Sequence, residues 1–227
     1  MLERAITPFY IVCDESSSMA GASIDAVNDG IVELFDEISA DPIIDAKVRV
    51  GIIAFNDSAR VLFPLTQLSD VTQIPVCVAS GSTSYANVFK LLRNELEKDL
   101  DVLKQQFNVF RPLVFFISHG TPNSNDNWCD ELIKLTDPTF KFSPNIVSFG
   151  VEGADKSVIA DFAHWGSSAE PKFYFMAQDI SSPAPALLEI IKWACNMRAT
   201  VEPGYSITDG ETIGNDSVRA YVVEAKK

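Results

Sequence analysis

Residues 9–19 read FYIVCDESSSM, and this stretch decides the fold of the chain. An apolar run from Phe9 to Cys13 ends at Asp14, where a loop of serines begins. A continuous apolar run with aromatic and β-branched residues is typical of a strand buried on both faces of a parallel sheet. Open α/β sheets place their ligands at the carboxyl ends of such strands. We therefore expect Asp14 at the ligand-binding edge of a central strand.

The loop after this run adds two oxygen atoms to the surroundings of Asp14. Ser16 and Ser18 are separated by one residue, so both hydroxyls can turn toward the space that the carboxylate faces. One carboxylate and two hydroxyls form an all-oxygen ligand set that suits Mg²⁺, Mn²⁺ or Ca²⁺. The same residue types also form turns and helix caps for local backbone reasons. This stretch alone leaves both interpretations open.

The composition predicts a globular protein with a full hydrophobic core. The chain has 227 residues, of which 47% are hydrophobic, and this length suits one large α/β domain. No apolar run approaches the roughly 18 residues that a membrane helix requires. The first strand begins so early that it leaves no room for a signal peptide. We therefore expect a cytoplasmic protein that has no membrane partner.

Charge and cysteine spacing exclude several classes of protein. The formal net charge of −13 argues against a nucleic-acid partner, because phosphate binding needs a basic surface. It fits a protein that attracts cations or a basic partner. The cysteines, Cys13, Cys77, Cys129 and Cys195, are widely scattered. This spacing predicts separate reduced thiols rather than a zinc ribbon or a disulfide framework.

Apolar spacing along the rest of the chain predicts strands that alternate with helices. We expect further strands at 47–55, 59–65, 111–118, 145–151 and 172–176, and helices from about residue 22 and at 85–103, 128–135, 155–164 and 180–197. This alternation indicates a doubly wound α/β fold, with a mostly parallel central sheet and helices on both faces. The segment 59–65 follows a turn sequence and is expected to form one antiparallel edge strand.

We expect one domain over residues 1–198 and a C-terminal tail over residues 199–227. The tail has turn signals at Pro203-Gly204 and Asp209-Gly210, and one short apolar run at 220–223. A hairpin, a strand added to a neighbour and a disordered segment are all consistent with this pattern.

Three polar loops are expected to meet at one edge of the sheet. The first is the Asp-x-Ser-x-Ser loop, the second holds Thr83 before the long predicted helix, and the third holds His119 after the strand at 111–118. If the two buried strands are adjacent and their helices leave on opposite faces, all three loops line one crevice.

With these three loops, the chain resembles the von Willebrand factor A family. The metal-ion-dependent adhesion site of that family combines Asp-x-Ser-x-Ser, a distant Thr and a later Asp. The segments FYIVCDESSSM, GSTSYANVF and VFFISHGTPN match those motifs in order and spacing. The resemblance implies a non-enzymatic protein-interaction module whose divalent cation, most readily Mg²⁺, keeps one coordination position open for an acidic residue of a protein partner. The metal-site residues that it implies are Asp14, Ser16, Ser18, Thr83 and His119.

Within that family, the phrase FISHGTPN followed by NW is similar to the TerY-type tellurium-resistance proteins of bacteria. Such proteins are associated with stress-response systems that include a protein kinase and a phosphatase. The resemblance therefore implies a kinase or a phosphatase as a partner.

One position departs from the family pattern, because His119 stands where the family has Asp. A neutral imidazole adds no negative charge and is a poor ligand for Mg²⁺. Three interpretations remain: weak Mg²⁺ binding completed by water, a metal-free scaffold, or recruitment of a softer ion such as Zn²⁺, Mn²⁺ or Ni²⁺. Asp126 is either a substitute carboxylate or a solvated loop residue.

An enzymatic function is not expected. A serine of the first loop with Asp14 and His119 superficially resembles a hydrolase triad. The Gly-x-Ser-x-Gly elbow is absent, however, and Asp14 lies beside the serines rather than behind the histidine. The first loop has no glycine-rich dinucleotide motif, and the chain has no P-loop. The other histidine, His164, is expected to be structural.

Overall fold

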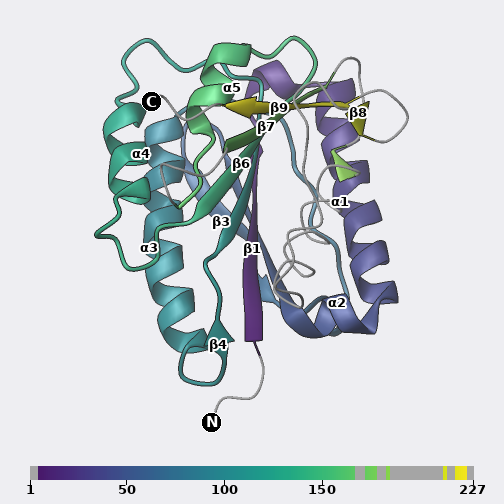
Figure 1. Cartoon of the computed structure of the whole chain (residues 1–227). Coiled ribbons are helices and arrows are strands. Elements are labelled where there is room, and N and C mark those ends of the chain that lie inside the picture. The colour runs from purple at the N-terminus through teal and green to yellow at the C-terminus, as the bar shows by residue number, and fades with distance from the viewer. Residues whose placement is uncertain (1–4, 167–171, 178–182, 185–211, 214–217, 224–227) are drawn as a thin grey trace.

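The described strands form one sheet with helices on both faces (Figure 1). The computed structural model describes residues 5–166, 172–177, 183–184, 212–213 and 218–223. The strands are β1 (Ala5–Asp14), β2 (Val48–Phe55), β3 (Ala59–Thr66), β4 (Asn108–Val109), β5 (Leu113–Ser118), β6 (Asn145–Gly150), β7 (Lys172–Ala177), β8 (Thr212–Ile213) and β9 (Val218–Val223). The helices are α1 (Ala22–Ala40), α2 (Pro42–Lys47), α3 (Tyr85–Leu103), α4 (Trp128–Thr136) and α5 (Lys156–Phe162).

β1 is a central strand of this sheet. The strand order is β3-β2-β1-β5-β6-β7-β9-β8, and β4 pairs with the start of β1. Residues 9–13 pair in parallel with β2 on one side and with β5 on the other. Every residue of β1 from Ile6 to Asp14 is buried. The prediction of a doubly wound α/β fold around this strand is therefore confirmed.

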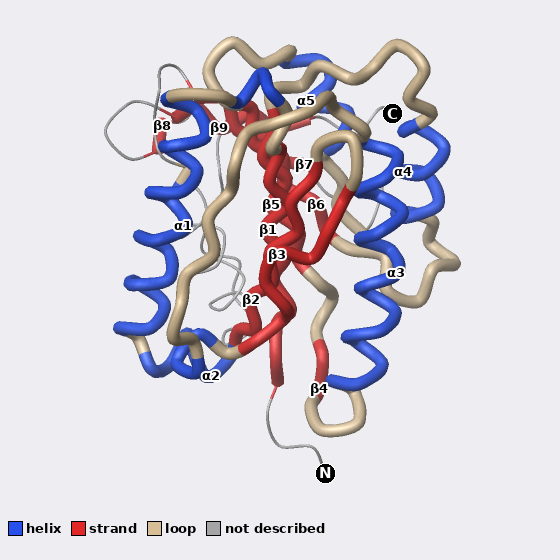
Figure 2. The backbone as a smooth tube through the Cα atoms, turned by 180° about the vertical axis from the view of Figure 1, so that it is seen from behind, coloured by secondary structure: helices blue, strands red, loops and turns tan. Residues whose placement is uncertain are grey.

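Alternate side chains of β1 enter two separate hydrophobic cores, because successive residues of a strand point to opposite faces. Phe9, Ile11 and Cys13 belong to the core that α1 covers. Tyr10 and Val12 belong to the core that α3 covers. Figure 2 shows α1 and α2 on one face of the sheet and α3 and α4 on the other.

The winding of the chain reverses beside β1. The chain passes from β1 through α1 and α2 to β2, and α3 later carries it back to β5 on the other side of β1. The two buried strands are therefore adjacent, as predicted. The loops that follow them leave toward opposite faces, and such a point is where open α/β sheets bind their ligands.

The sheet has an antiparallel strand at each edge, whereas the sequence predicted only one. β3 pairs antiparallel with β2, as expected. At the other edge β9 pairs antiparallel with β7, and β8 pairs with β9. Of the three possibilities for the tail, the structure therefore shows a strand added to a neighbour, within a short hairpin. The domain boundary at residue 198 stays a prediction, although β9 shares the sheet of the domain.

Helix ends follow local capping. α3 spans the predicted residues, and the Ser84 side chain accepts a hydrogen bond from the Asn87 N–H at 3.4 Å. Apolar spacing does not predict the short helix α2, where Asp41 caps the helix start and Pro42 occupies its first turn. The predicted helix at 180–197 falls almost entirely outside the described residues. None of the helices in the described part is long and apolar enough to cross a membrane.

His164 should make stability depend on pH. Burial, followed by the positive charges of Lys172 and Arg111, lowers its pKa to about 4. Between pH 6.5 and 4 the unfolded chain therefore binds more protons than the folded protein, so stability falls as the pH falls through this window. Since His164 is only half-buried, we expect His164→Gln to remove roughly 1 kcal/mol of this loss. Urea unfolding of both proteins at pH 7 and 4.5 measures it, and parallel pH profiles would contradict the prediction.

Candidate functional site

The structure places the first and third predicted loops, which hold Asp14 and His119, at the carboxyl ends of β1 and β5. Asp14 is the last residue of β1 and is fully buried, whereas Ser18 is exposed on a short 3₁₀ turn at Ser17–Met19. Thr83 is buried in the loop before α3. That loop contacts the serine loop through its backbone, because the Ser17 N–H donates to the Gly81 carbonyl at 3.0 Å.

The Asp14 carboxylate is held by donors on both of its oxygens. Oδ1 accepts the Ser16 backbone N–H at 2.9 Å, and Oδ2 accepts the Ser118 hydroxyl at 2.7 Å. The His119 backbone N–H lies at the limit of hydrogen bonding, 3.5 Å from Oδ2. Because each carboxylate oxygen can accept two hydrogen bonds, this arrangement orients Asp14 and still leaves it acceptor capacity.

A buried chain of hydroxyls supports Asp14 from behind. The Ser118 oxygen accepts the Gly120 N–H at 3.0 Å and lies 2.7 Å from the Tyr85 hydroxyl. Burial and, secondarily, the Asp14 charge raise the pKa of Tyr85, so its phenol stays protonated. Ser118 gives its single proton to Asp14, and Tyr85 therefore donates to Ser118.

No local pattern in the sequence predicts this support. From the sequence, Ser118 is only the last residue of a predicted strand, and Tyr85 is only the first residue of a predicted helix. The only signal in the sequence was a serine at the end of a buried strand, which says nothing about its partner.

The two serine hydroxyls of the first loop lie side by side. The oxygens of Ser16 and Ser18 are 2.8 Å apart. Ligands at right angles on Mg²⁺, each about 2.0–2.1 Å from the ion, would be about 2.9 Å apart. The separation and the oxygen chemistry of this pair therefore fit two neighbouring positions of an octahedral Mg²⁺ shell.

His119 and Asp126 make other contacts. The Nδ1 atom of the His119 ring lies 3.1 Å from the Thr121 hydroxyl oxygen. The Asp126 carboxylate accepts the N–H groups of Tyr85 at 2.5 Å and Ala86 at 3.2 Å, so it caps the start of α3. The structure therefore gives Asp126 a helix-capping role and does not place it as a substitute ligand. No group of three or more His, Cys, Asp or Glu side chains suited to a metal occurs among the described residues.

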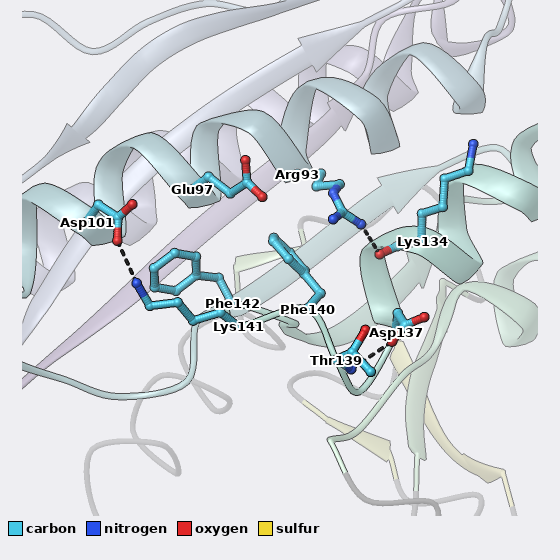
Figure 3. Close-up of a pocket in the computed structure, with 9 residues that line it drawn as sticks. All are labelled: Arg93, Glu97, Asp101, Lys134, Asp137, Thr139, Phe140, Lys141 and Phe142. Atoms are coloured by element: carbon cyan, nitrogen blue, oxygen red, sulfur yellow. Dashed lines mark hydrogen bonds and ion pairs between the residues drawn. The ribbon is translucent and has the colours of Figure 1, made fainter.

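A separate cavity of about 440 Å³ lies between α3 and the loop after α4 (Figure 3). It is lined by Arg93, Glu97, Asp101, Lys134, Asp137, Thr139, Phe140, Lys141 and Phe142. Several of its polar groups already have partners within the chain: Lys141 pairs with Asp101 at 2.9 Å. The Arg93 guanidinium stacks 4.2 Å from the centre of the Phe140 ring. None of the predicted site residues lines this cavity.

Residues 9–120 match the family described as von Willebrand factor type A domain. The match covers 112 of the 227 residues, just under half of the chain. The match includes all three loops of the candidate site. Domains of the von Willebrand factor type A family are usually non-catalytic modules that bind protein partners. Among curated protein sequences, none matches the chain.

Solved structures of low sequence identity share the fold. A von Willebrand factor type A protein from Catenulispora acidiphila has 12% identity and a TM-score of 0.62, over 84% of this chain and 43% of that chain. Proximal thread matrix protein 1 from the mussel byssus has 16% identity and a TM-score of 0.55, over 85% of this chain and 49% of that chain. BatB from Bacteroides thetaiotaomicron has 16% identity and a TM-score of 0.55, over 86% of this chain and 100% of that chain.

The chain thus matches only about half the length of the first two proteins. Identities this low show the fold and nothing more. The mussel protein has also been solved with zinc in its metal-ion-dependent adhesion motif, with a TM-score of 0.49, and that zinc is a property of the mussel protein.

The hydroxyl chain behind Asp14 should contribute to stability. Ser118→Ala removes one donor to Asp14 and leaves the buried Tyr85 hydroxyl without its partner. We expect a loss of about 1–3 kcal/mol in the free energy of unfolding, because buried polar groups are costly to leave unsatisfied. Urea unfolding at pH 7 measures it.

The matched control is Tyr10→Phe, which removes a hydrogen bond from another buried phenol to Asp99 at 3.0 Å. This bond is remote from the candidate site and should contribute about 0.5–1.5 kcal/mol. If Ser118→Ala proved no more destabilising than this control, the support assigned to Asp14 would be wrong.

Proposed function

We propose that this chain is a non-enzymatic protein-interaction module that binds a divalent cation, most readily Mg²⁺, and captures an acidic residue of a protein partner there. The observation that carries the proposal is the pair of hydroxyl oxygens 2.8 Å apart, two and four residues after an oriented buried carboxylate. The family match over residues 9–120 supports it.

Each residue of the proposed site has a distinct role. Asp14 supplies negative charge in a fixed orientation, Ser16 and Ser18 supply neutral hydroxyl ligands, and Thr83 supplies a further hydroxyl from a separate loop. When bound, the cation supplies a positive centre with an open position for the carboxylate of the partner. Mn²⁺ and Ca²⁺ prefer the same oxygen chemistry and are the expected substitutes.

His119 changes the charge of this site in a way that suits an acidic partner. With a neutral imidazole, Asp14 is the only charged residue among the five proposed site residues, so a bound divalent cation gives them a net charge of +1. An Asp at position 119 would make that sum zero. The imidazole therefore weakens cation binding but increases the attraction between the loaded site and a carboxylate. This local charge matters because the chain as a whole carries −13 and repels acidic partners at long range.

We extend the proposal to the biological setting that the TerY-type resemblance implies. In this hypothesis the chain works in the cytoplasm, within a bacterial stress or tellurium-resistance system, and its partner is a kinase or a phosphatase of that system. The sequence phrase around His119 supports this extension.

A second candidate is a metal-free scaffold of the same fold. It is favoured by His119 in place of an acidic ligand, and by the protein donors that already contact both oxygens of Asp14. In this case the partner would bind another surface.

Calorimetric titration of Mg²⁺, Mn²⁺ and Zn²⁺ into chelator-stripped protein separates the two candidates. We expect Mg²⁺ to bind the natural protein, Asp14→Ala to abolish binding, and His119→Asp to strengthen it roughly tenfold through the added charge. Asp137→Asn is the control, because this carboxylate lies at the separate cavity beside α3 and accepts the Thr139 hydroxyl at 2.6 Å. Binding by the His119→Asp variant alone would establish the scaffold instead.

Partner capture gives an independent prediction. A kinase or phosphatase of the same system should bind the natural protein in Mg²⁺, and lose this binding in chelator or with Asp14→Ala. Pull-down of purified partners on immobilised chain measures it, with Asp137→Asn as the control. Capture that Asp14→Ala leaves intact would mean that the site is not the docking point.

A further inference from the structure

We propose that Glu15 and Arg60 form a clamp that positions the Thr83 loop at the metal site. The inference rests on the proposed function, because its consequence is a change in cation affinity. Neither residue belongs to the proposed ligand set, and Arg60 lies on the edge strand β3. We call the contacts between residues 15–17 and 78–81, together with Arg60, the Glu15 clamp.

Glu15 is a buried charge: Oε1 accepts a hydrogen bond, and Oε2 forms an ion pair without hydrogen-bond geometry. Its side chain is 1% exposed, and the Arg60 guanidinium lies 2.6 Å from Oε2. Oε1 accepts the Val78 backbone N–H at 2.9 Å. A buried carboxylate is costly unless it is paired and hydrogen-bonded. The ion pair with Arg60 therefore stabilises the Glu15 carboxylate in its buried position. This carboxylate is the acceptor that holds the Val78 N–H.

The backbone of the serine loop joins the same segment. The Glu15 carbonyl accepts the Ser80 N–H at 2.6 Å, and the Ser17 N–H donates to the Gly81 carbonyl at 3.0 Å. On its other side, the Glu15 N–H donates to the Phe55 carbonyl at the end of β2. The clamp thus ties the end of β2, the serine loop and the Thr83 loop together.

The Thr83 loop depends on these contacts for its position. Residues 71–84 contain no helix or strand, so no regular hydrogen-bond pattern orders them. Gly81 has a φ of +74°, and a Cβ there would meet the Asp57 carboxylate, so the loop packs closely on the β2–β3 turn. Beyond Thr83, the Ser84 N–H donates to the Asn56 carbonyl at 2.9 Å. Thr83 is therefore fixed between the clamp and this second anchor.

The clamp also joins the two parts of the proposed ligand set. Ser16 and Ser18 lie on the same loop as Glu15, whereas Thr83 lies two residues beyond Gly81. Whatever holds the two loops together sets the distance between their hydroxyls. Residues that orient metal ligands in this way typically change affinity by about 10- to 100-fold when they are replaced. Glu15 and Arg60 are positioning residues in this sense.

The first arm of the test needs no metal. Amide hydrogen exchange is measured on the chelator-stripped natural protein, Arg60→Met and Glu15→Gln. We expect Arg60→Met to speed amide exchange at Ser17, Val78 and Ser80. The Arg60 side chain is half-exposed, so its replacement should be tolerated by the fold. Glu15→Gln provides a second variant should Arg60→Met not fold.

The control for this arm is Asp45→Asn. Asp45 is another buried carboxylate, which accepts the N–H groups of Leu68 and Ser69. Its replacement should leave exchange at residues 78–81 unchanged. Unchanged exchange in both clamp variants would overturn the clamp itself.

The second arm is a double-mutant cycle on Mg²⁺ affinity. Arg60→Met should raise the Kd about tenfold or more in the natural background. In a Thr83→Ala background it should raise the Kd little, because the ligand that the clamp positions is gone. In the Asp137→Asn background the full effect should remain, because Asp137 lies at the separate cavity and contacts neither loop. An equal effect in the Thr83→Ala background would show a general loss of structure and would overturn the positioning role.

The two arms separate this inference from the proposed function. If the natural protein binds no Mg²⁺, the proposed function fails together with the role of the clamp in affinity, and the exchange arm still decides whether the clamp orders the loop. If Mg²⁺ binds and Arg60→Met leaves the Kd unchanged, the positioning inference alone is wrong.

Discussion

The placement of one buried carboxylate at the end of β1 organises this protein. Asp14 lies between strands β2 and β5 and receives hydrogen bonds from the Ser16 N–H and the Ser118 hydroxyl. Tyr85, at the first turn of α3, supports Ser118 in turn. A buried charge without such donors would be costly. The same contacts that satisfy Asp14 therefore connect the central strand, its neighbour and the helix on the opposite face from α1.

The two-core architecture explains why the polar loops meet. Because β1 supplies side chains to both cores, α1 and α3 must cover opposite faces of the sheet. Their loops then leave the same edge in opposite directions, and the oxygen-bearing residues collect between them. The arrangement has few negative charges for a cation site, since His119 bonds to Thr121 and Asp126 caps α3. Cation affinity in the proposed site therefore depends strongly on how accurately its neutral hydroxyls are placed.

Accurate placement is the task assigned to the Glu15 clamp. Glu15 follows Asp14 directly, and in a strand-to-loop transition successive side chains point in different directions. One carboxylate therefore faces the proposed site while the next faces the loop that carries Thr83. Arg60 contributes from β3, one of the two antiparallel edges, so that three neighbouring strands take part in the geometry of one site. The large cavity beside α3 has no share in this network (Figure 3).

The sequence by itself determined the elements whose signals are local. The apolar run that ends at Asp14, the helical spacing of 85–103 and the turn before β3 were sufficient to predict the α/β fold and the order of its parts, because burial and periodicity are properties of neighbouring residues. Only the tertiary structure decided which distant groups meet. Apart from the neighbouring Ser16 N–H, the partners of Asp14, Glu15 and Asp126 come from residues between 40 and 105 positions away along the chain. In the same way, β9 joins β7 across more than forty residues. Such pairings depend on the packing of the whole sheet, and no local pattern records them.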